Sequence, residues 1–260
     1  MEKTYKKLVK GLADYCKQNG FKKAVLGLSG GVDSSLTLKI AVDALGAENV
    51  TGILMPEIGL TKEENMIHAK GLADYFGVKT YNVSINSMLV PFNTVPWHPS
   101  TLAQMNTKAR VRMVTLYTFA NTERAIVLGT SNKSECMLGY GTKYGDAASD
   151  IFVIGDLLKT QVWKLAEHLG LPDEIVKKAP SAELISGQTD EGELGATYRE
   201  LDQILVLVEK ECADMNDEKE VERAINHITD KGLDPLHVRK VFRLIRENQH
   251  KGKIPPIIRV

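Results

Sequence analysis

The residues best suited to chemistry lie in one short stretch, SGGVDS, at Ser29–Ser34. Two adjacent glycines let backbone N–H groups approach a ligand with no Cβ in the way. The hydroxyls of Ser29 and Ser34 add donors. An apolar helical pattern begins just after Asp33, and the N-terminus of a helix favours an anion. The stretch therefore predicts a phosphate-binding turn between a strand and a helix.

Two familiar phosphate-binding motifs do not fit this stretch. A Walker P-loop needs a lysine after its second glycine, and none follows these glycines. The spacing of Gly27, Gly30 and Gly31 does not supply the Gly-x-Gly-x-x-Gly of a dinucleotide site. Asp33 would repel phosphates unless a cation lay between them, which suggests Mg²⁺. The plainer alternative is an ordinary turn in which Asp33 caps the helix.

Strands and helices alternate along the first two thirds of the chain. Apolar runs predict strands at 23–28, 50–55, 78–83, 124–128 and 151–154. Helical spacing predicts helices at 2–19, 34–45, 61–76, 100–121 and 160–169, and three more near 197–211, 217–230 and 235–249. Thr61 is expected to cap the helix that it begins, with Glu64 three residues on. The segment 181–195 shows no periodic apolar pattern and is expected to be a loop.

This order of elements predicts the fold class. It is α/β, an open parallel sheet of about five strands with helices on both faces, Rossmann-like, plus C-terminal helices. Residues 1–260 are expected to form a single domain. In such a sheet ligands gather at the carboxyl ends of the strands, where the strand order reverses. Asp33 follows the first strand and Glu135 follows the fourth, so the two carboxylates are expected to converge there on Mg²⁺.

The composition narrows the class of partner. Lys+Arg and Asp+Glu balance at 33 each, so the net charge does not indicate a nucleic acid or a membrane as a binding partner. The three cysteines, Cys16, Cys136 and Cys212, lie far apart and suggest neither a disulfide framework nor a zinc site. No apolar run approaches the ~18 residues of a membrane span. A cytoplasmic protein is expected.

The helix expected at 100–121, with Ser100 as its cap, carries two apolar lines, one through Met113 and one through Val114. A helix that is apolar on two faces is buried on two sides. We favour packing against a second subunit over a thicker core.

The stretch at Ser29–Ser34 resembles the signature of the N-type ATP pyrophosphatases. Within that group the chain is similar to the NAD synthetase family through six further strings in register. They are NTKARVRM at 106–113, GTSNKSE at 129–135, GTKYGD at 141–146, GDLLKTQV at 155–162, PSAEL at 180–184 and GQTDE at 187–191. The resemblance covers roughly residues 5–256.

The resemblance implies a role for each matching residue. ATP would be bound by Gly27, Leu28, Ser29, Gly30, Gly31, Val32, Asp33, Ser34, Thr130, Lys159 and Ser181. Asp33 and Glu135 would hold Mg²⁺, and Asp33 and Lys159 would be catalytic. Deamido-NAD would be contacted by Arg110, Lys143, Asp150, His250 and Lys251, some of them across the interface of a homodimer.

The family's reaction is implied with the resemblance. The nicotinate carboxylate of deamido-NAD attacks the α-phosphorus of ATP, and pyrophosphate leaves. Ammonia then attacks the adenylate, and NAD and AMP are formed. A fused glutaminase domain would need a few hundred residues before position 1, so free ammonia is the expected donor, with a separate amidotransferase as one conceivable supplier. The loops near 84–99 and 181–195 are expected to close over the site and exclude water.

Three other functions remain open at this point. A GMP synthetase can share the ATP motif but should lack the strings at 106–113 and 141–150. A tRNA-thiolating or lysidine-forming enzyme is disfavoured because the chain has no paired cysteines and no basic excess. A nucleotide sensor without catalysis would not require Asp33, Glu135, Lys143 and Lys159 together.

Overall fold

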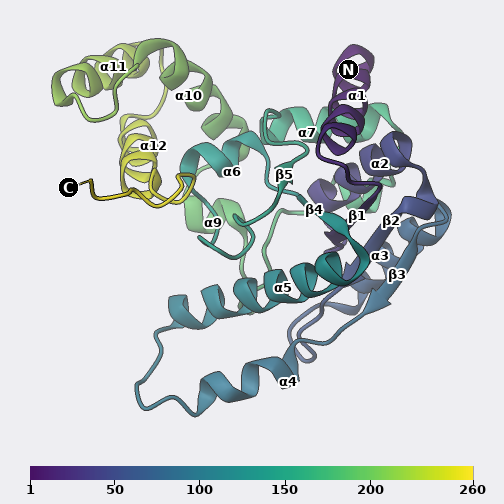
Figure 1. Cartoon of the computed structure of the whole chain (residues 1–260). Coiled ribbons are helices and arrows are strands. Elements are labelled where there is room, and N and C mark those ends of the chain that lie inside the picture. Colours follow the sequence, from purple (N-terminus) through teal and green to yellow (C-terminus); the bar gives the residue numbers. More distant parts are fainter. Residues whose placement is uncertain (260) are drawn as a thin grey trace.

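Five parallel strands form the centre of the molecule in the computed structural model, which describes residues 1–259 (Figure 1). Their order is β3-β2-β1-β4-β5, and neighbouring strands pair in parallel throughout. The strands are β1 (Lys23–Gly27), β2 (Val50–Leu54), β3 (Lys79–Asn82), β4 (Ala125–Gly129) and β5 (Ile151–Phe152). The central strands read as continuous apolar runs because helices cover both of their faces.

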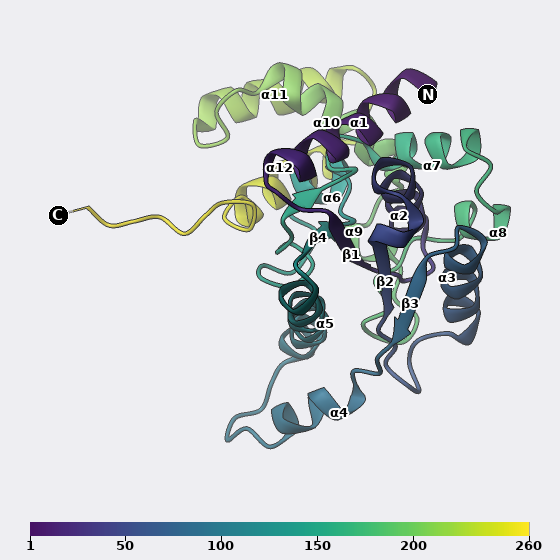
Figure 2. The same cartoon turned by 45° about the vertical axis from the view of Figure 1, so that its right-hand side comes forward.

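Two hydrophobic cores lie on opposite faces of the sheet. On one face Leu26 of β1 and Ile126 of β4 pack against helices that precede, link or follow the strands. These are α1 (Glu2–Gln18), α2 (Val32–Leu45), α3 (Glu63–Tyr75), α7 (Lys159–His168) and α8 (Asp173–Val176). On the other face Val25 and Val127 pack against α5 (Thr101–Glu123), and Ile85 before it in the chain joins the same core. Figure 2 shows α5 on the opposite side of the sheet from α3. The predicted fold class is confirmed.

The C-terminal helices build a third core beside the sheet (Figure 1). Leu138 of α6 (Lys133–Leu138) belongs to this core, and Trp163 of α7 packs against both it and the main core. The helices are α9 (Asp190–Leu194), α10 (Tyr198–Glu211), α11 (Glu218–Asp230) and α12 (Pro235–Asn248). The remaining short elements are η1 (Ala47–Asn49), α4 (Asn86–Leu89) and η2 (Val90–Asn93). Within residues 1–259 no helix is both long and apolar enough to cross a bilayer.

Some boundaries differ from those predicted. The N-cap of α3 is Lys62, and the Thr61 hydroxyl instead accepts the Glu57 N–H at 3.0 Å, so the predicted capping box is wrong. Arg124, expected to begin a strand, ends α5 in a left-handed conformation with φ 55°. The segment 181–195, expected to be a loop, contains α9, which is short and shows little periodicity. Ser100 caps α5 as predicted, accepting the Ala103 N–H at 3.2 Å.

The strand order creates one reversal point. From β1 the chain moves outward to β2 and β3, and it then returns to β4 on the other side of β1. The loops that leave the carboxyl ends of β1 and β4 therefore run in opposite directions and leave a crevice between them. Both predicted carboxylates follow these two strands.

Candidate active site

The turn after β1 has a shape that only glycine suits. Gly30 has a φ of +76°, and a Cβ added there would lie 2.3 Å from the carbonyl oxygen of Asn65 at the start of α3. The next residue, Gly31, is the N-cap of α2. Asp33 is therefore inside the first turn of the helix, and its carboxylate is not the cap. The alternative role of Asp33 as the helix cap is therefore wrong.

Two serine hydroxyls brace the same turn. The Oγ atoms of Ser29 and Ser34 lie 3.1 Å apart, and the Ser34 hydroxyl donates to the Gly31 carbonyl oxygen at 3.0 Å. The N–H groups of the first helical turn have no partner within the helix. The turn is thus preorganised with hydroxyls and N–H donors together at a helix N-terminus, an arrangement that suits phosphate oxygens.

The turn after β4 is tied to the turn after β1 through Asn132. Its side chain is fully buried and caps α6, accepting the Glu135 N–H at 3.0 Å. Its amide nitrogen donates to Asp33 Oδ1 at 3.0 Å and to Glu135 Oε1 at 2.7 Å. Asn132 therefore holds the carboxylates of Asp33 and Glu135 close to each other. This role of Asn132 was not predicted, although an asparagine followed three residues later by glutamate is a recognisable capping signal.

The ammonium of Lys159 lies between the same two carboxylates. Lys159 begins α7 and is 2% exposed, its Nζ pairs with Asp33, and Glu135 Oε1 lies 3.6 Å away. Burial alone would lower the pKa of Lys159, but the charges of Asp33 and Glu135 raise it above its ordinary value. Burial and the neighbouring Asp33 charge raise the pKa of Glu135 to about 8. The predicted convergence of Asp33 and Glu135 is thus observed, and the structure adds the Lys159 ammonium between them.

This donor set fits a divalent cation bound together with a phosphate. Mg²⁺ prefers hard oxygen ligands and is commonly held by one or two carboxylates, with waters and phosphate oxygens completing the shell. In the described part of the chain no three His, Cys, Asp or Glu side chains are grouped as a closed metal site. Asp33 and Glu135 could therefore hold Mg²⁺ only if other molecules supplied further ligands.

The other residues expected to contact ATP lie in neighbouring loops. Thr130 directly follows β4, at the same edge of the sheet as the turn after β1. Ser181 follows α8, and its hydroxyl donates to the Gln188 carbonyl oxygen at 2.7 Å while accepting the Glu183 N–H at 3.1 Å. Ser181 is therefore fixed at the base of the 181–188 loop.

Four of the five residues expected to contact the second substrate are linked to one another. The Arg110 guanidinium donates to the Lys143 carbonyl oxygen at 3.3 Å, and the Lys143 ammonium donates to the His250 carbonyl oxygen at 2.8 Å. The Lys251 ammonium donates to the Gly139 carbonyl oxygen at 2.8 Å. The end of α12, the loop after α6 and α5 thus meet at one place.

Asp150 has different partners from those four residues. Its carboxylate accepts the Val127 N–H of β4 at 2.8 Å and the Tyr117 hydroxyl of α5 at 3.0 Å. Both carboxylate oxygens are therefore engaged within the chain. Its local role in this structure is to fasten the start of β5 to β4 and α5.

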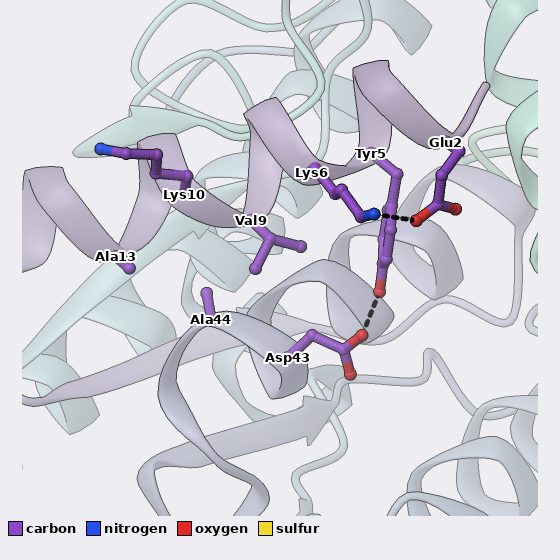
Figure 3. Close-up of a pocket in the computed structure, with 8 residues that line it drawn as sticks. All are labelled: Glu2, Tyr5, Lys6, Val9, Lys10, Ala13, Asp43 and Ala44. Carbon is purple, nitrogen blue, oxygen red and sulfur yellow. Dashed lines mark hydrogen bonds and ion pairs between the residues drawn. The ribbon is translucent and has the colours of Figure 1, made fainter.

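A shallow hollow of about 510 Å³ lies elsewhere, between α1 and α2 (Figure 3). Its polar groups are already paired, since the Tyr5 hydroxyl bonds to Asp43 and Lys6 pairs with Glu2 at 3.1 Å. It offers neither a phosphate-binding turn nor converging carboxylates. The crevice between β1 and β4 is the better candidate site.

Comparison with known proteins decides the family. A family model described as NAD synthase matches residues 4–255. The chain belongs to the NAD synthase family. The predicted resemblance is therefore confirmed, and with it the expectation of a ligase that forms a C–N bond.

Relatives and solved structures in the NAD synthase family match this chain along nearly its full length. The NH(3)-dependent NAD(+) synthetase of Methanocaldococcus jannaschii is 42% identical over 260 residues, which cover 98% of this chain and 96% of the relative. The structure of an NH3-dependent NAD synthetase from Campylobacter jejuni, in complex with nitrate, is 31% identical with a TM-score of 0.80 and covers 99% and 98%. That of an NMN synthetase from Francisella tularensis is also 31% identical, with a TM-score of 0.83 and coverage of 100% and 98%.

Proposed function

We propose that this chain is an ammonia-dependent NAD synthetase, which uses ATP to convert deamido-NAD and ammonia into NAD, AMP and pyrophosphate. The observation that carries the proposal is the buried Lys159 ammonium between the partly buried carboxylates of Asp33 and Glu135 at the reversal point of the sheet, in a chain of this family. A protein that only bound a nucleotide would have no need for a buried ammonium among carboxylates beside the phosphate-binding turn.

The first step would be attack of the nicotinate carboxylate on the α-phosphorus of ATP. The turn after β1 would hold the phosphates through its N–H groups and through Ser29 and Ser34. Mg²⁺, held by Asp33 and Glu135, would neutralise phosphate charge when bound. Negative charge grows on the departing pyrophosphate, and the ammonium of Lys159 is placed to stabilise it.

The second step would be attack of ammonia on the activated carbonyl, with AMP as the leaving group. Deamido-NAD would be held by Arg110, Lys143, Asp150, His250 and Lys251. Water must be excluded from the adenylate, because it would otherwise hydrolyse that species. We assign this task to the loops 84–99 and 181–195.

A homodimer through α5 is part of the proposal. Leu102 and Val114 on this helix are 65% and 66% exposed, and Trp97 in the preceding segment is 64% exposed. Large exposed apolar side chains along one helix favour a protein interface. Arg110 lies on the same helix, so a partner there would be adjacent to the substrate residues.

We also propose that residues 1–260 act as a single catalytic domain. Trp163 packs against both the main core and the C-terminal core, and the Lys159 ammonium lies over the ring of Tyr198 in α10. The C-terminal helices therefore help to build the site.

One assay tests the function. Purified protein is given Mg-ATP, ammonium and one of three substrates: deamido-NAD, nicotinate mononucleotide or xanthosine monophosphate. We expect equal amounts of NAD and AMP with deamido-NAD, and loss of both in Asp33→Asn with an unchanged circular dichroism spectrum. No AMP with deamido-NAD at any ammonium concentration would refute the proposal.

The assay with nicotinate mononucleotide tests a second candidate function. The likeness to the Francisella NMN synthetase favours amidation of nicotinate mononucleotide as the alternative. Higher kcat/KM with the mononucleotide than with deamido-NAD would decide for it. Turnover of xanthosine monophosphate would instead indicate a GMP synthetase.

A further inference from the structure

A second polar cluster, formed by Asp190, Tyr140 and Tyr198, lies behind the catalytic cluster. Asp190 is 5% exposed and Tyr198 is fully buried. The Tyr140 hydroxyl bonds to Asp190 Oδ1 at 3.2 Å, and the Tyr198 hydroxyl bonds to Asp190 Oδ2 at 3.3 Å. Two tyrosines from different elements thus converge on one buried carboxylate.

This cluster touches the catalytic lysine directly. The Nζ atom of Lys159 lies 5.3 Å from the centre of the Tyr198 ring, within the range of a cation–π interaction. A phenol hydroxyl that donates to a carboxylate makes its ring more electron-rich, which strengthens the attraction. The ammonium of Lys159 is therefore held from two sides, by Asp33 and Glu135 and by the Tyr198 ring backed by Asp190.

The cluster also fixes the loop that carries Ser181. The backbone N–H of Asp190 donates to the Pro180 carbonyl oxygen at 3.0 Å, which closes the loop at its base. Within the loop the Ser181 hydroxyl donates to the Gln188 carbonyl oxygen. The segment that carries the Asp190 carboxylate is therefore tied directly to the base of the loop that carries Ser181.

A further bond joins this loop to the turn after α6. The Gln188 side chain donates to Glu193 Oε1 at 3.0 Å. The single proton of the Tyr140 hydroxyl lies between two carboxylates, with Glu193 Oε2 at 2.5 Å and Asp190 Oδ1 at 3.2 Å. Tyr140 directly precedes the loop that carries Lys143. One network thus connects the lysine, the Ser181 loop and the segment expected to contact the second substrate.

We propose that Asp190, Tyr198 and Tyr140 are positioning residues of the amidation reaction. They hold the Lys159 ammonium and the Ser181 loop in one fixed arrangement, and they act through those residues rather than on substrate. This inference rests on the proposed function.

The unfavourable free energy of burying the Asp190 charge supports a functional role for the cluster. Burial raises the pKa of Asp190, which means that the interior disfavours its charge. Replacing buried charged groups with well-packed apolar ones is often neutral or stabilising. A cluster needed only for stability would therefore not require a carboxylate here.

The test uses single-atom changes with a matched control. Tyr198→Phe and Tyr140→Phe each remove one hydroxyl, and Asp190→Asn removes the charge at nearly constant volume. The control is Tyr5→Phe, which removes the buried tyrosine–aspartate bond to Asp43 between α1 and α2, far from the crevice (Figure 3). For each protein the urea midpoint, kcat, KM for each substrate and the calorimetric affinity for Mg-pyrophosphate are measured.

We expect the three cluster variants to lower kcat about tenfold, as loss of a supporting hydrogen bond around a site commonly does. Their Mg-pyrophosphate affinity should fall, while KM for deamido-NAD changes less than twofold. Tyr5→Phe should lose comparable stability and keep wild-type kcat. If the wild type makes NAD but Tyr198→Phe and Tyr140→Phe keep kcat and pyrophosphate affinity within twofold of Tyr5→Phe, the inference is wrong. If the wild type makes no NAD, the proposed function itself has failed, and the pyrophosphate affinities still compare the cluster with its control.

Discussion

Replacement of Gly30 by alanine tests whether the phosphate-binding turn depends on the close approach of α3. Gly30 has a φ of +76°, and its missing Cβ would lie 2.3 Å from the carbonyl oxygen and 3.0 Å from the Cα of Asn65. These atoms are backbone and cannot rotate away. Gly30→Ala must therefore move either the turn or the start of α3.

Two contributions add to the expected effect on stability. An L-residue in the left-handed region costs about 1–2 kcal/mol. Forcing an extra methyl group into a packed contact costs about 1–3 kcal/mol. Together they predict a loss of about 3 kcal/mol for Gly30→Ala, a large fraction of the ~5–15 kcal/mol that stabilises a typical protein.

The chain contains a control for the first contribution alone. Gly20 has a φ of +75°, and a Cβ there would meet no atom within 4 Å. The free energy of unfolding of Gly20→Ala should fall only by the cost of the left-handed backbone conformation, and the variant should retain full activity. Urea unfolding would give the free energies of unfolding, and calorimetry with a non-hydrolysable ATP analogue would give the affinities.

The difference in free energy of unfolding between the two variants measures the steric clash with the backbone of Asn65 alone. Gly30→Ala should be less stable than Gly20→Ala by about 2 kcal/mol, and it should bind the analogue at least tenfold more weakly than the wild type. Equal stabilities, together with wild-type nucleotide affinity, would refute the reasoning that the turn must stay close to α3.

Two further predictions concern the carboxylates and the helix α5. The pKa of Glu135 is raised from 4.5 to about 8, so without metal the unfolded chain releases its proton first and the free energy of unfolding should fall as pH rises from about 4.5 to about 8. In urea unfolding experiments with EDTA, the free energy of unfolding of Glu135→Gln should depend less on pH over this range. The same pH dependence as in the wild type would contradict the raised pKa of Glu135. Val114→Glu should convert a dimer into a monomer in light-scattering measurements, whereas Ile67→Glu, at an equally exposed apolar position on α3, should leave the dimer intact. A Val114→Glu dimer would exclude α5 as the interface.

Local sequence patterns were sufficient for the strands and the longer helices, but not for the short helices α6 and α9. Continuous apolar runs located β1, β2 and β4, because helices cover both faces of these central strands. The edge strands β3 and β5 are partly exposed, and only short apolar stretches at 78–83 and 151–154 indicated them. The SGGVDS stretch indicated an anion site because glycines, hydroxyls and a helix start lie within six residues. The mistaken cap at Thr61 shows the limit of this reasoning, since its hydroxyl bonds to Glu57 rather than to its own helix.

The residues that join distant segments were beyond local patterns. Asn132 touches Asp33 across 99 positions of sequence, and Lys159 touches it across 126. Asp190 lies in the segment 181–195, which was expected to be a loop, and no local spacing connects it with Tyr140 or with Tyr198 of the predicted helix near 197–211. The contacts of the Asp150 carboxylate with β4 and α5 were likewise not predicted, while its contact with the substrate stays a prediction.

The sequence by itself was enough to predict an anion site where β1 meets α2, because that site is built from consecutive residues and one helix terminus. Only the tertiary structure decided which side chains share the crevice with it. The parallel sheet places the ends of β1 and β4 side by side, and the buried Lys159 must find compensating charge there. That requirement, which acts between segments far apart in the chain, joins Asp33, Glu135 and the tyrosine cluster into one site.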